Sequence, residues 1–362
     1  MKVGVYLADL DRSRTDSQGI INYARDMLGP IQLALNPCDE LVILANSALL
    51  EEIETSSCRV TVLKHSGSRF RRLWLDNVAM VRWAKKESLD VLHLPKGMSS
   101  PAVRFLSAKL VATVHDDIPK QYFNGGFPYL GSRLKLAIVV AQLHQSLKRA
   151  AVVLTDSEFS REQLSGWEPQ CASRIQVVPP SLSRTKAAAS KAEPPYALLF
   201  TSELPHKRSA ETIELVGPIL LRFGVSLLAV GSRRPPSGYI TDWVGPAVQQ
   251  SVLDSLVGAA TLLVFGSAYE GFGLPPIEAW LQGTPALVAA ERPMTDHLAG
   301  FPGLFNFQDP LSCESAIVDL LGLDGTEIER LARALRERFT DGRVVTGLTH
   351  MYDGLRRDLS DR

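Results

Sequence analysis

The sequence predicts a two-domain α/β protein in which each domain contains a mostly parallel, doubly wound sheet. Short apolar runs alternate with helical patterns through both halves of the chain, which is typical of βαβ units. The chain has 362 residues, a length that suits two domains better than one. Hydrophobic residues make up 45% of the chain, which is enough for two full cores.

Composition argues against several classes of function. The 39 Lys and Arg residues equal the 39 Asp and Glu residues, so overall charge predicts no nucleic-acid partner. Cys38, Cys58, Cys171 and Cys313 are far apart and lack metal-ligand spacing, so we expect reduced thiols, no metal and no cofactor. The apolar run at the N-terminus is too short for a signal peptide, and no stretch reaches the ~18 apolar residues of a membrane span. We therefore expect a cytoplasmic protein.

Residues 1–183 are expected to form the first domain. Apolar runs predict buried strands at 2–8, 40–45, 59–63, 90–94, 109–114, 151–155 and 175–178, with helices at 20–35 and 132–150. Gly19 precedes the first helix. It permits close approach of a ligand, but a glycine is equally common as a helix cap, and both interpretations stay open.

Residues 64–86 are strongly basic, with seven cations against Asp76 alone, and Trp74 and Trp83 lie among them. A basic helix with aromatic residues can lie on an anionic membrane surface, so peripheral contact with the inner face of a membrane is one interpretation. An ordinary amphipathic helix with a solvated polar face explains the same pattern and is favoured.

Residues 184–195 are small, charged and closed by prolines, which indicates a linker. The second domain is expected at 196–345. Its predicted strands are 196–201, 226–230, 260–265, 285–289 and 303–307, and its predicted helices are 252–259, the segment ending at 281, 309–321 and 327–339. Residues 291–296 are expected to form a loop, and 350–359 a last helix.

The most informative stretch is A-Y-E-G-F-G-L-P-P-I-E-A-W-L-Q-G-T-P at 268–285. It follows a buried strand, so Glu270 is expected at a strand's carboxyl end, where open α/β sheets bind ligands. Gly271 and Gly273 let the backbone approach a ligand, and the N-terminus of the next helix favours phosphate. Glu270 and Glu278 can accept hydrogen bonds from sugar hydroxyls. The turn therefore predicts a site for a phosphorylated sugar.

This stretch resembles the Glu-x7-Glu signature of retaining, nucleotide-sugar-dependent GT-B glycosyltransferases of group 1, family 4. Its G-F-G-L-P-P segment is similar to that of a subgroup rich in mannosyltransferases. The resemblance implies two facing Rossmann-like domains and a C-terminal helix, within 346–362, that crosses back to the first domain. It implies metal-independent transfer of a hexosyl unit to a glycan or lipid-linked saccharide, with mannose from GDP-mannose favoured. A UDP-sugar-dependent transferase and a catalytically inactive nucleotide-sugar-binding protein stay open as alternatives.

The resemblance also implies roles for single residues. His115, in H-D-D-I-P, would contact the donor sugar near the reacting carbon. Lys207, in S-E-L-P-H-K-R, would bind the donor diphosphate. His206 and Arg208 stand where the family's Pro-Arg-Lys-Asn element has Arg and Asn, and Arg208 could replace the missing cation. Glu270 would bind sugar hydroxyls near the anomeric carbon, and Glu278 would bind the ribose. The other implied donor contacts are Gly19, Gly271, Phe272, Gly273, Leu274, Ser232, Trp243 and Val244. The segment S-E-F-S-R at 157–161 is similar to a family element that can be wholly structural.

Overall fold

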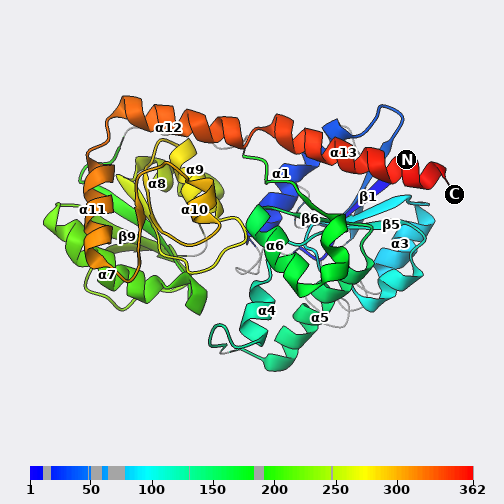
Figure 1. Ribbon diagram of the computed structural model, residues 1–362, viewed down its shortest axis with the longest axis horizontal. Coiled ribbons are helices and arrows are strands. Elements are labelled where there is room, and N and C mark those ends of the chain that lie inside the picture. The colour runs from blue at the N-terminus through cyan, green and yellow to red at the C-terminus, as the bar shows by residue number, and fades with distance from the viewer. Residues whose placement is uncertain are drawn as a thin grey trace. The chain divides into compact units, whose positions relative to one another are not determined.

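The computed structural model describes residues 1–10, 18–47, 49, 59–63, 78–129, 131–182, 191–245 and 248–361. It divides into two compact units (Figure 1). The first unit comprises Met1–Ser181 and Thr340–Arg362, and the second comprises Leu182–Phe339.

The first unit is built on a seven-stranded sheet in which every pair of neighbouring strands is parallel, in the order β3-β2-β1-β4-β5-β6-β7. Its strands are β1 (Lys2–Leu7), β2 (Glu40–Asn46), β3 (Arg59–Leu63), β4 (Val91–Leu94), β5 (Lys109–Thr113), β6 (Val152–Thr155) and β7 (Ile175–Val177). Each corresponds to a predicted apolar run, because the inner strands of such a sheet are covered on both faces.

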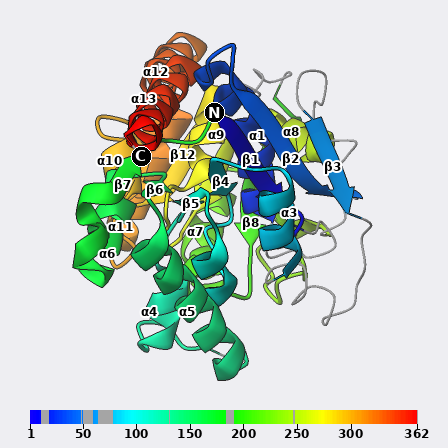
Figure 2. The same ribbon diagram turned by 90° about the vertical axis from the view of Figure 1, so that its right-hand side faces the viewer.

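Helices cover both faces of this sheet, as expected for a doubly wound domain. They are α1 (Gln18–Ala34), α3 (Met80–Lys86), α4 (Ile118–Phe123), α5 (Arg133–Arg149), α6 (Glu158–Trp167) and α13 (Asp341–Ser360), with 3-10 helices η4 (Pro101–Phe105) and η5 (Pro169–Arg174). Helices α1 and α13 share one hydrophobic cluster with the sheet, and α3, α5 and α6 share the other. Figure 2 shows the same elements from the side.

The C-terminal helix is longer than predicted. Helix α13 begins at Asp341, where the Thr340 side chain caps it by accepting a hydrogen bond from the amide of Arg343. The expected boundary at 345 therefore falls inside one continuous helix. Leu348, Met351 and neighbouring side chains of α13 pack into the cluster that contains α1, so this helix belongs to the first unit.

The basic segment at 64–86 is described only from residue 78. There, Trp83 is 6% exposed and lies in the core of the first unit. A Cβ on Gly4 of β1 would come within 2.9 Å of the Trp83 ring. Trp83 is therefore a packing residue. Residues 64–77, with Trp74, lie outside the described residues.

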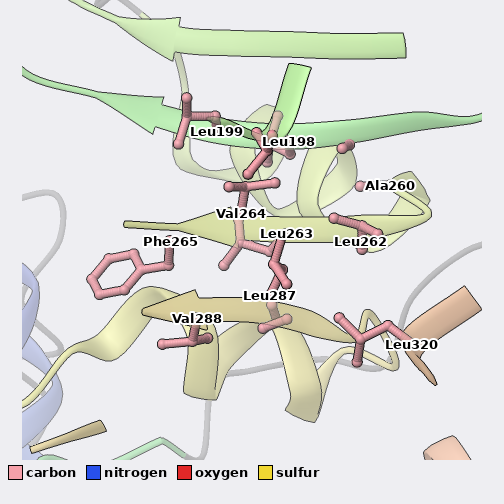
Figure 3. Packing of buried hydrophobic residues seen from close by; sticks show 14 of the residues in the cluster. Leu198, Leu199, Ala260, Leu262, Leu263, Val264, Phe265, Leu287, Val288 and Leu320 are labelled. Atoms are coloured by element: carbon pink, nitrogen blue, oxygen red, sulfur yellow. The ribbon is translucent and has the colours of Figure 1, made fainter. Parts of the chain in front are cut away.

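The second unit is built on a six-stranded parallel sheet in the order β10-β9-β8-β11-β12-β13. Its strands are β8 (Tyr196–Thr201), β9 (Ser226–Gly231), β10 (Ile240–Val244), β11 (Leu262–Phe265), β12 (Ala286–Ala289) and β13 (Leu304–Phe305). Figure 3 shows β11 between β8 and β12, with Leu198, Leu263 and Leu287 among the buried side chains around it.

The helices of this unit are η6 (Pro205–Lys207), α7 (Ser209–Arg222), α8 (Gln250–Ala259), α9 (Leu274–Leu281), α10 (Met294–His297), α11 (Pro310–Leu321) and α12 (Gly325–Arg338). Two details differ from expectation. The segment expected as a loop at 291–296 includes the start of α10. The end of the expected linker is attached to this unit, because the Lys191 ammonium donates to the Ala260 carbonyl at 2.9 Å and to Thr284 Oγ1 at 2.7 Å.

Candidate functional site: the carboxyl edges of the two sheets

Two loops meet at the carboxyl edge of the second sheet. Strands β8 and β11 are neighbours, with Leu198 opposite Leu263. The loop after β8 runs into η6, and the loop after β11 runs to the glycine turn before α9. The amide of Ala268 donates to the His206 carbonyl at 2.7 Å, which joins the two loops. Residues far apart in the sequence are therefore neighbours here.

An ion pair links the same two loops. The Lys207 ammonium donates to Glu270 Oε1 at 2.5 Å. The Lys207 side chain is 29% exposed and the Glu270 side chain 13%, so both charges remain accessible to a ligand. The neighbouring His206 is buried, and burial followed by the Lys207 charge lowers the pKa of its imidazole to about 4. His206 is therefore neutral near pH 7 and does not add a cation.

Arg208 has an unusual backbone conformation. Its φ of 48° and ψ of 35° lie in the left-handed region, where Gly and Asn are far more common. The side chain is well held: the guanidinium lies 3.0 Å from Glu291 Oε1 and stacks 4.8 Å from the centre of the Phe307 ring. A strained residue whose cationic side chain is held in place at the carboxyl edge of a parallel sheet is a candidate for a functional role.

The glycine turn before α9 is tightly constrained. Gly273 caps the helix with a φ of 81°, and a Cβ there would lie 2.3 Å from the Met294 Cε atom. Pro275 and Pro276 occupy the first turn of the helix, so they remove two of the amide donors that a helix N-terminus normally offers. The amides of Gly273 and Leu274 remain as the donors of this turn.

The predicted site residues of this stretch differ in burial and packing. Phe272 is 5% exposed and packs 4.4 Å, ring centre to ring centre, from His297, whose Nδ1 lies 3.0 Å from the Phe272 carbonyl. Phe272 is thus a packing residue in this structure. Gly271 is buried next to it, and Glu278 is partly buried within α9.

A cavity of about 340 Å³ opens beside Arg208. It lies at the ends of β8 and β9 and the start of α7, and Ser202, Arg208, Ser209 and Ser232 contribute polar groups to its lining. Its volume is within the usual range of small-ligand sites. Ser232 and Arg208 therefore line the same cavity.

The predicted base-reading residues lie on the edge strand β10. Trp243 and Val244 pack against the hydrophobic core of the second unit. Their side chains therefore have a packing role, and recognition of a base by their backbone stays a prediction.

His115 has two protein partners in the first unit. It follows β5, and its Nδ1 lies 2.6 Å from Asp156 Oδ2, at the end of β6. Its Nε2 lies 2.9 Å from the Pro95 carbonyl, at the end of β4. Both partners are acceptors, so both ring nitrogens must carry hydrogens and the imidazole is a cation. Burial alone lowers the pKa of His115, but the Asp156 charge and these hydrogen bonds outweigh it and raise the pKa to about 9.

Surrounding groups complete this arrangement. The Tyr23 ring packs edge-on at 4.6 Å from the imidazole, and the Ser160 hydroxyl donates to the His115 carbonyl at 2.8 Å. Contact between a donor sugar and a ring nitrogen of His115 would require one of the two internal hydrogen bonds to break.

Gly19 also lies in this unit, near the start of α1, and a Cβ there would meet nothing within 4 Å. Packing therefore does not require a glycine at this position.

Sequence reasoning missed Asp156 as a partner of His115. The only available signal was an acidic residue immediately after a buried strand, next to the S-E-F-S-R element. Its pairing with His115 spans 41 residues and depends on β5 and β6 being neighbours in the sheet.

Among the described residues, no group of three or more His, Cys, Asp or Glu side chains is arranged to hold a metal ion. No helix in the described ranges is both long and apolar enough to span a bilayer.

Comparisons with known proteins agree with this architecture. The sequence model of Glycosyltransferase Family 4 matches residues 41–184. Sucrose-phosphate synthase from Thermosynechococcus elongatus superposes with a TM-score of 0.70 at 18% identity, covering 100% of this chain and 99% of that one. Anabaena HepE, crystallised with UDP and glucose, superposes with a TM-score of 0.63 at 14% identity, covering 98% and 99%. The chain has the GT-B fold.

A curated relative points in the same direction as the GT-B fold. The O-antigen chain mannosyltransferase RfbU of Salmonella typhimurium is 25% identical over 244 residues. The match covers 60% of this chain and 66% of that protein, slightly less than two thirds of its length. The family match and the GT-B fold together support a glycosyltransferase, and the expected fold class is confirmed.

Proposed function

We propose that the protein is a retaining glycosyltransferase that moves a hexosyl unit from a nucleoside diphosphate sugar to a glycan or lipid-linked saccharide. The observation that carries this proposal is the Lys207–Glu270 ion pair, which links the loops after β8 and β11 at 2.5 Å. It sets a phosphate-binding cation beside a hydroxyl-binding carboxylate, and Arg208 follows directly in the chain. In a sugar diphosphate, the phosphate oxygens would face the cations and the neighbouring sugar hydroxyls would face the carboxylate.

In the absence of donor, the ion pair holds the Lys207 ammonium and the Glu270 carboxylate in position. When the diphosphate arrives, Lys207 exchanges the carboxylate for a phosphate oxygen, and Glu270 is released to accept from sugar hydroxyls near the anomeric carbon. Glu278 binds the ribose. The bond between the anomeric carbon and the phosphate oxygen then breaks, and the acceptor oxygen bonds on the same face. The leaving phosphate oxygen takes the acceptor's proton.

The growing negative charge of the leaving diphosphate is stabilised by groups already in place. Lys207, Arg208 and the amides of Gly273 and Leu274 are held at one edge of the sheet before the reaction starts, which is the condition for effective electrostatic catalysis. These cations and amides supply what a divalent metal would otherwise provide. The reaction is therefore metal-independent in this proposal.

The relatives bear on the choice of donor and acceptor. Mannose from GDP-mannose is favoured because the curated relative is an O-antigen chain mannosyltransferase. A UDP-sugar is the second candidate because HepE was crystallised with UDP and glucose. An O-antigen relative also favours a growing glycan as acceptor, with the enzyme cytoplasmic and peripheral at the inner face of the membrane. Membrane contact through 64–86 stays the less favoured interpretation of that segment, because Trp83 is buried in the core of the first unit.

Donor binding and turnover can be tested together. GDP-mannose and UDP-glucose should raise the Tm to different extents, because a tighter ligand stabilises the folded state more. Lys207→Met and Glu270→Gln should each reduce transfer, and donor hydrolysis without acceptor, by at least about a hundredfold. An ion pair of the same unit, between Arg222 and Glu314 at 2.8 Å, provides the matched control. Arg222→Met should leave turnover near the wild-type value.

Three results would decide against the proposal. Near-normal turnover in both site variants would remove the assigned roles of Lys207 and Glu270. Donor binding without any hydrolysis or transfer would favour the inactive binding protein. A product with the anomeric configuration opposite to that of the donor, measured by NMR, would exclude retention.

A further inference from the structure

Helices α4 and α5 carry apolar side chains on the outside of the first unit. Leu134 is 72% exposed, Ile138 51% and Phe123 40%. Leu134 and Ile138 are four residues apart in α5, so they lie on the same side of the helix. Arg133 and Lys135, both exposed, flank Leu134. We call these five residues the α4–α5 face.

The α4–α5 face is additional to the packing face of α5. Leu136, Leu143 and Leu147 of the same helix are buried, and the last two lie in the core of the unit. A surface helix of a globular domain normally has one apolar stripe, directed inward, and a polar opposite side. Helix α5 instead has exposed apolar residues near its start. Figures 1 and 2 both show α4 and α5 together at one extremity of this unit.

The charged residues that α4 and α5 themselves contribute are all basic. From residue 118 to residue 150 the sequence contains five Lys and Arg residues and no Asp or Glu. Arg133 directs its guanidinium to the Tyr122 and Phe123 carbonyls, at 3.4 and 3.5 Å, and over the Phe123 ring. Within the described ranges, neither Arg133 nor Lys135 forms an ion pair with a carboxylate. The face therefore presents uncompensated positive charge beside exposed apolar groups.

We propose that the α4–α5 face docks on the surface of a lipid bilayer that contains anionic headgroups. Exposed Leu, Ile and Phe side chains can enter the boundary between headgroups and acyl chains, while flanking Arg and Lys bind the anionic headgroups. A nucleic acid would use the cations but would leave Leu134 and Ile138 in water. This surface differs from the segment 64–86, whose Trp83 is buried, and it does not depend on the proposed transfer chemistry.

Vesicle binding tests the inference directly. The full-length protein is mixed with vesicles of phosphatidylcholine alone or of phosphatidylcholine with phosphatidylglycerol, and the bound fraction is measured by flotation at low and high salt. We expect binding to the anionic vesicles, weakened by salt, and little binding to neutral ones. Lys135→Gln should weaken binding about fivefold, since one basic residue near an anionic surface contributes about that factor. The double variant Leu134→Gln/Ile138→Gln should weaken binding at least about tenfold.

A matched control separates this face from general surface hydrophobicity. Leu33 on α1 is 73% exposed, almost the same as Leu134, so Leu33→Gln should bind like the wild type. All of these side chains are exposed, so the Tm of each variant should stay within a few degrees of the wild type. A loss of vesicle binding would then not be caused by unfolding. Equal binding to neutral and anionic vesicles would overturn the proposal, as would unchanged binding by the double variant. So would a self-association in solution that the double variant abolishes, because the face would then join two copies of the chain.

Discussion

Replacing Asp156 by Asn should convert His115 from a cation to a neutral imidazole. In the wild type, the carboxylate lies 2.6 Å from Nδ1 and the pKa of His115 is raised from 6.5 to about 9. The variant removes the charge but keeps the size of the side chain. Burial, which lowers the pKa of His115, then acts against only the hydrogen bond to Pro95 and the smaller effect of the Asp116 charge, and we expect a pKa below about 6.5.

The magnitude follows from linkage between protonation and folding. A pKa of about 9 in the folded state against 6.5 in the unfolded state corresponds to about 3 kcal/mol of stability, to order of magnitude. Because the folded pKa of His115 is raised, this contribution is fully present below pH ~6.5. It is lost as the pH rises through about 9, where the folded state also releases the proton. The Asp156→Asn variant should lack this pH-dependent contribution to the free energy of unfolding.

The assay is an NMR titration of the His115 imidazole in both proteins, with urea unfolding at pH ~6 and ~9.5 as a second measurement. The control is Asp116→Asn, since Asp116 raises the pKa of His115 less than Asp156 does. The loss of stability between the two pH values should be about 3 kcal/mol smaller in Asp156→Asn than in the wild type. If wild-type His115 titrates near 6.5, or keeps a pKa near 9 without Asp156, then the Asp156 carboxylate does not hold His115 in its cationic form.

Two further predictions concern backbone positions of the second unit. Gly273→Ala should destabilise the protein by about 1–3 kcal/mol in urea unfolding, because the φ of 81° is unfavourable for Ala and its Cβ would meet Met294. Met294 is itself buried, so the Gly273→Ala cost is measured again in a Met294→Ala background; the φ penalty should remain there, and a cost of zero would show that only the contact mattered. Arg208→Asn should keep or slightly raise the Tm, because Asn tolerates the left-handed backbone, while donor affinity in a titration falls at least about tenfold. Unchanged affinity would exclude Arg208 from the diphosphate site.

The elements with the clearest local patterns were predicted well. Every strand except the edge strand β10 coincides with a predicted apolar run, because a strand covered on both faces has little room for polar side chains. The turn at 268–285 was placed after β11 for the same reason. Strand β10 contains the exposed Thr241 and Asp242 and has no such run. Helix α13 was predicted only in its second half. Its first half contains Gly342 and Gly347, which disfavour helix, and it is stabilised by packing of Val344 and Leu348 into the first unit.

The sequence by itself determined which apolar segments are strands, where those strands end and that Lys207 and Glu270 follow such ends. These properties depend on local apolarity and on residues such as Gly and Pro that act within a few positions. Only the tertiary structure decided which side chains meet: Lys207 with Glu270 across 63 residues, and His115 with Asp156 across 41. Those contacts follow from the order of strands in each sheet. Strand order results from the packing of the whole domain, so it leaves no local trace in the chain.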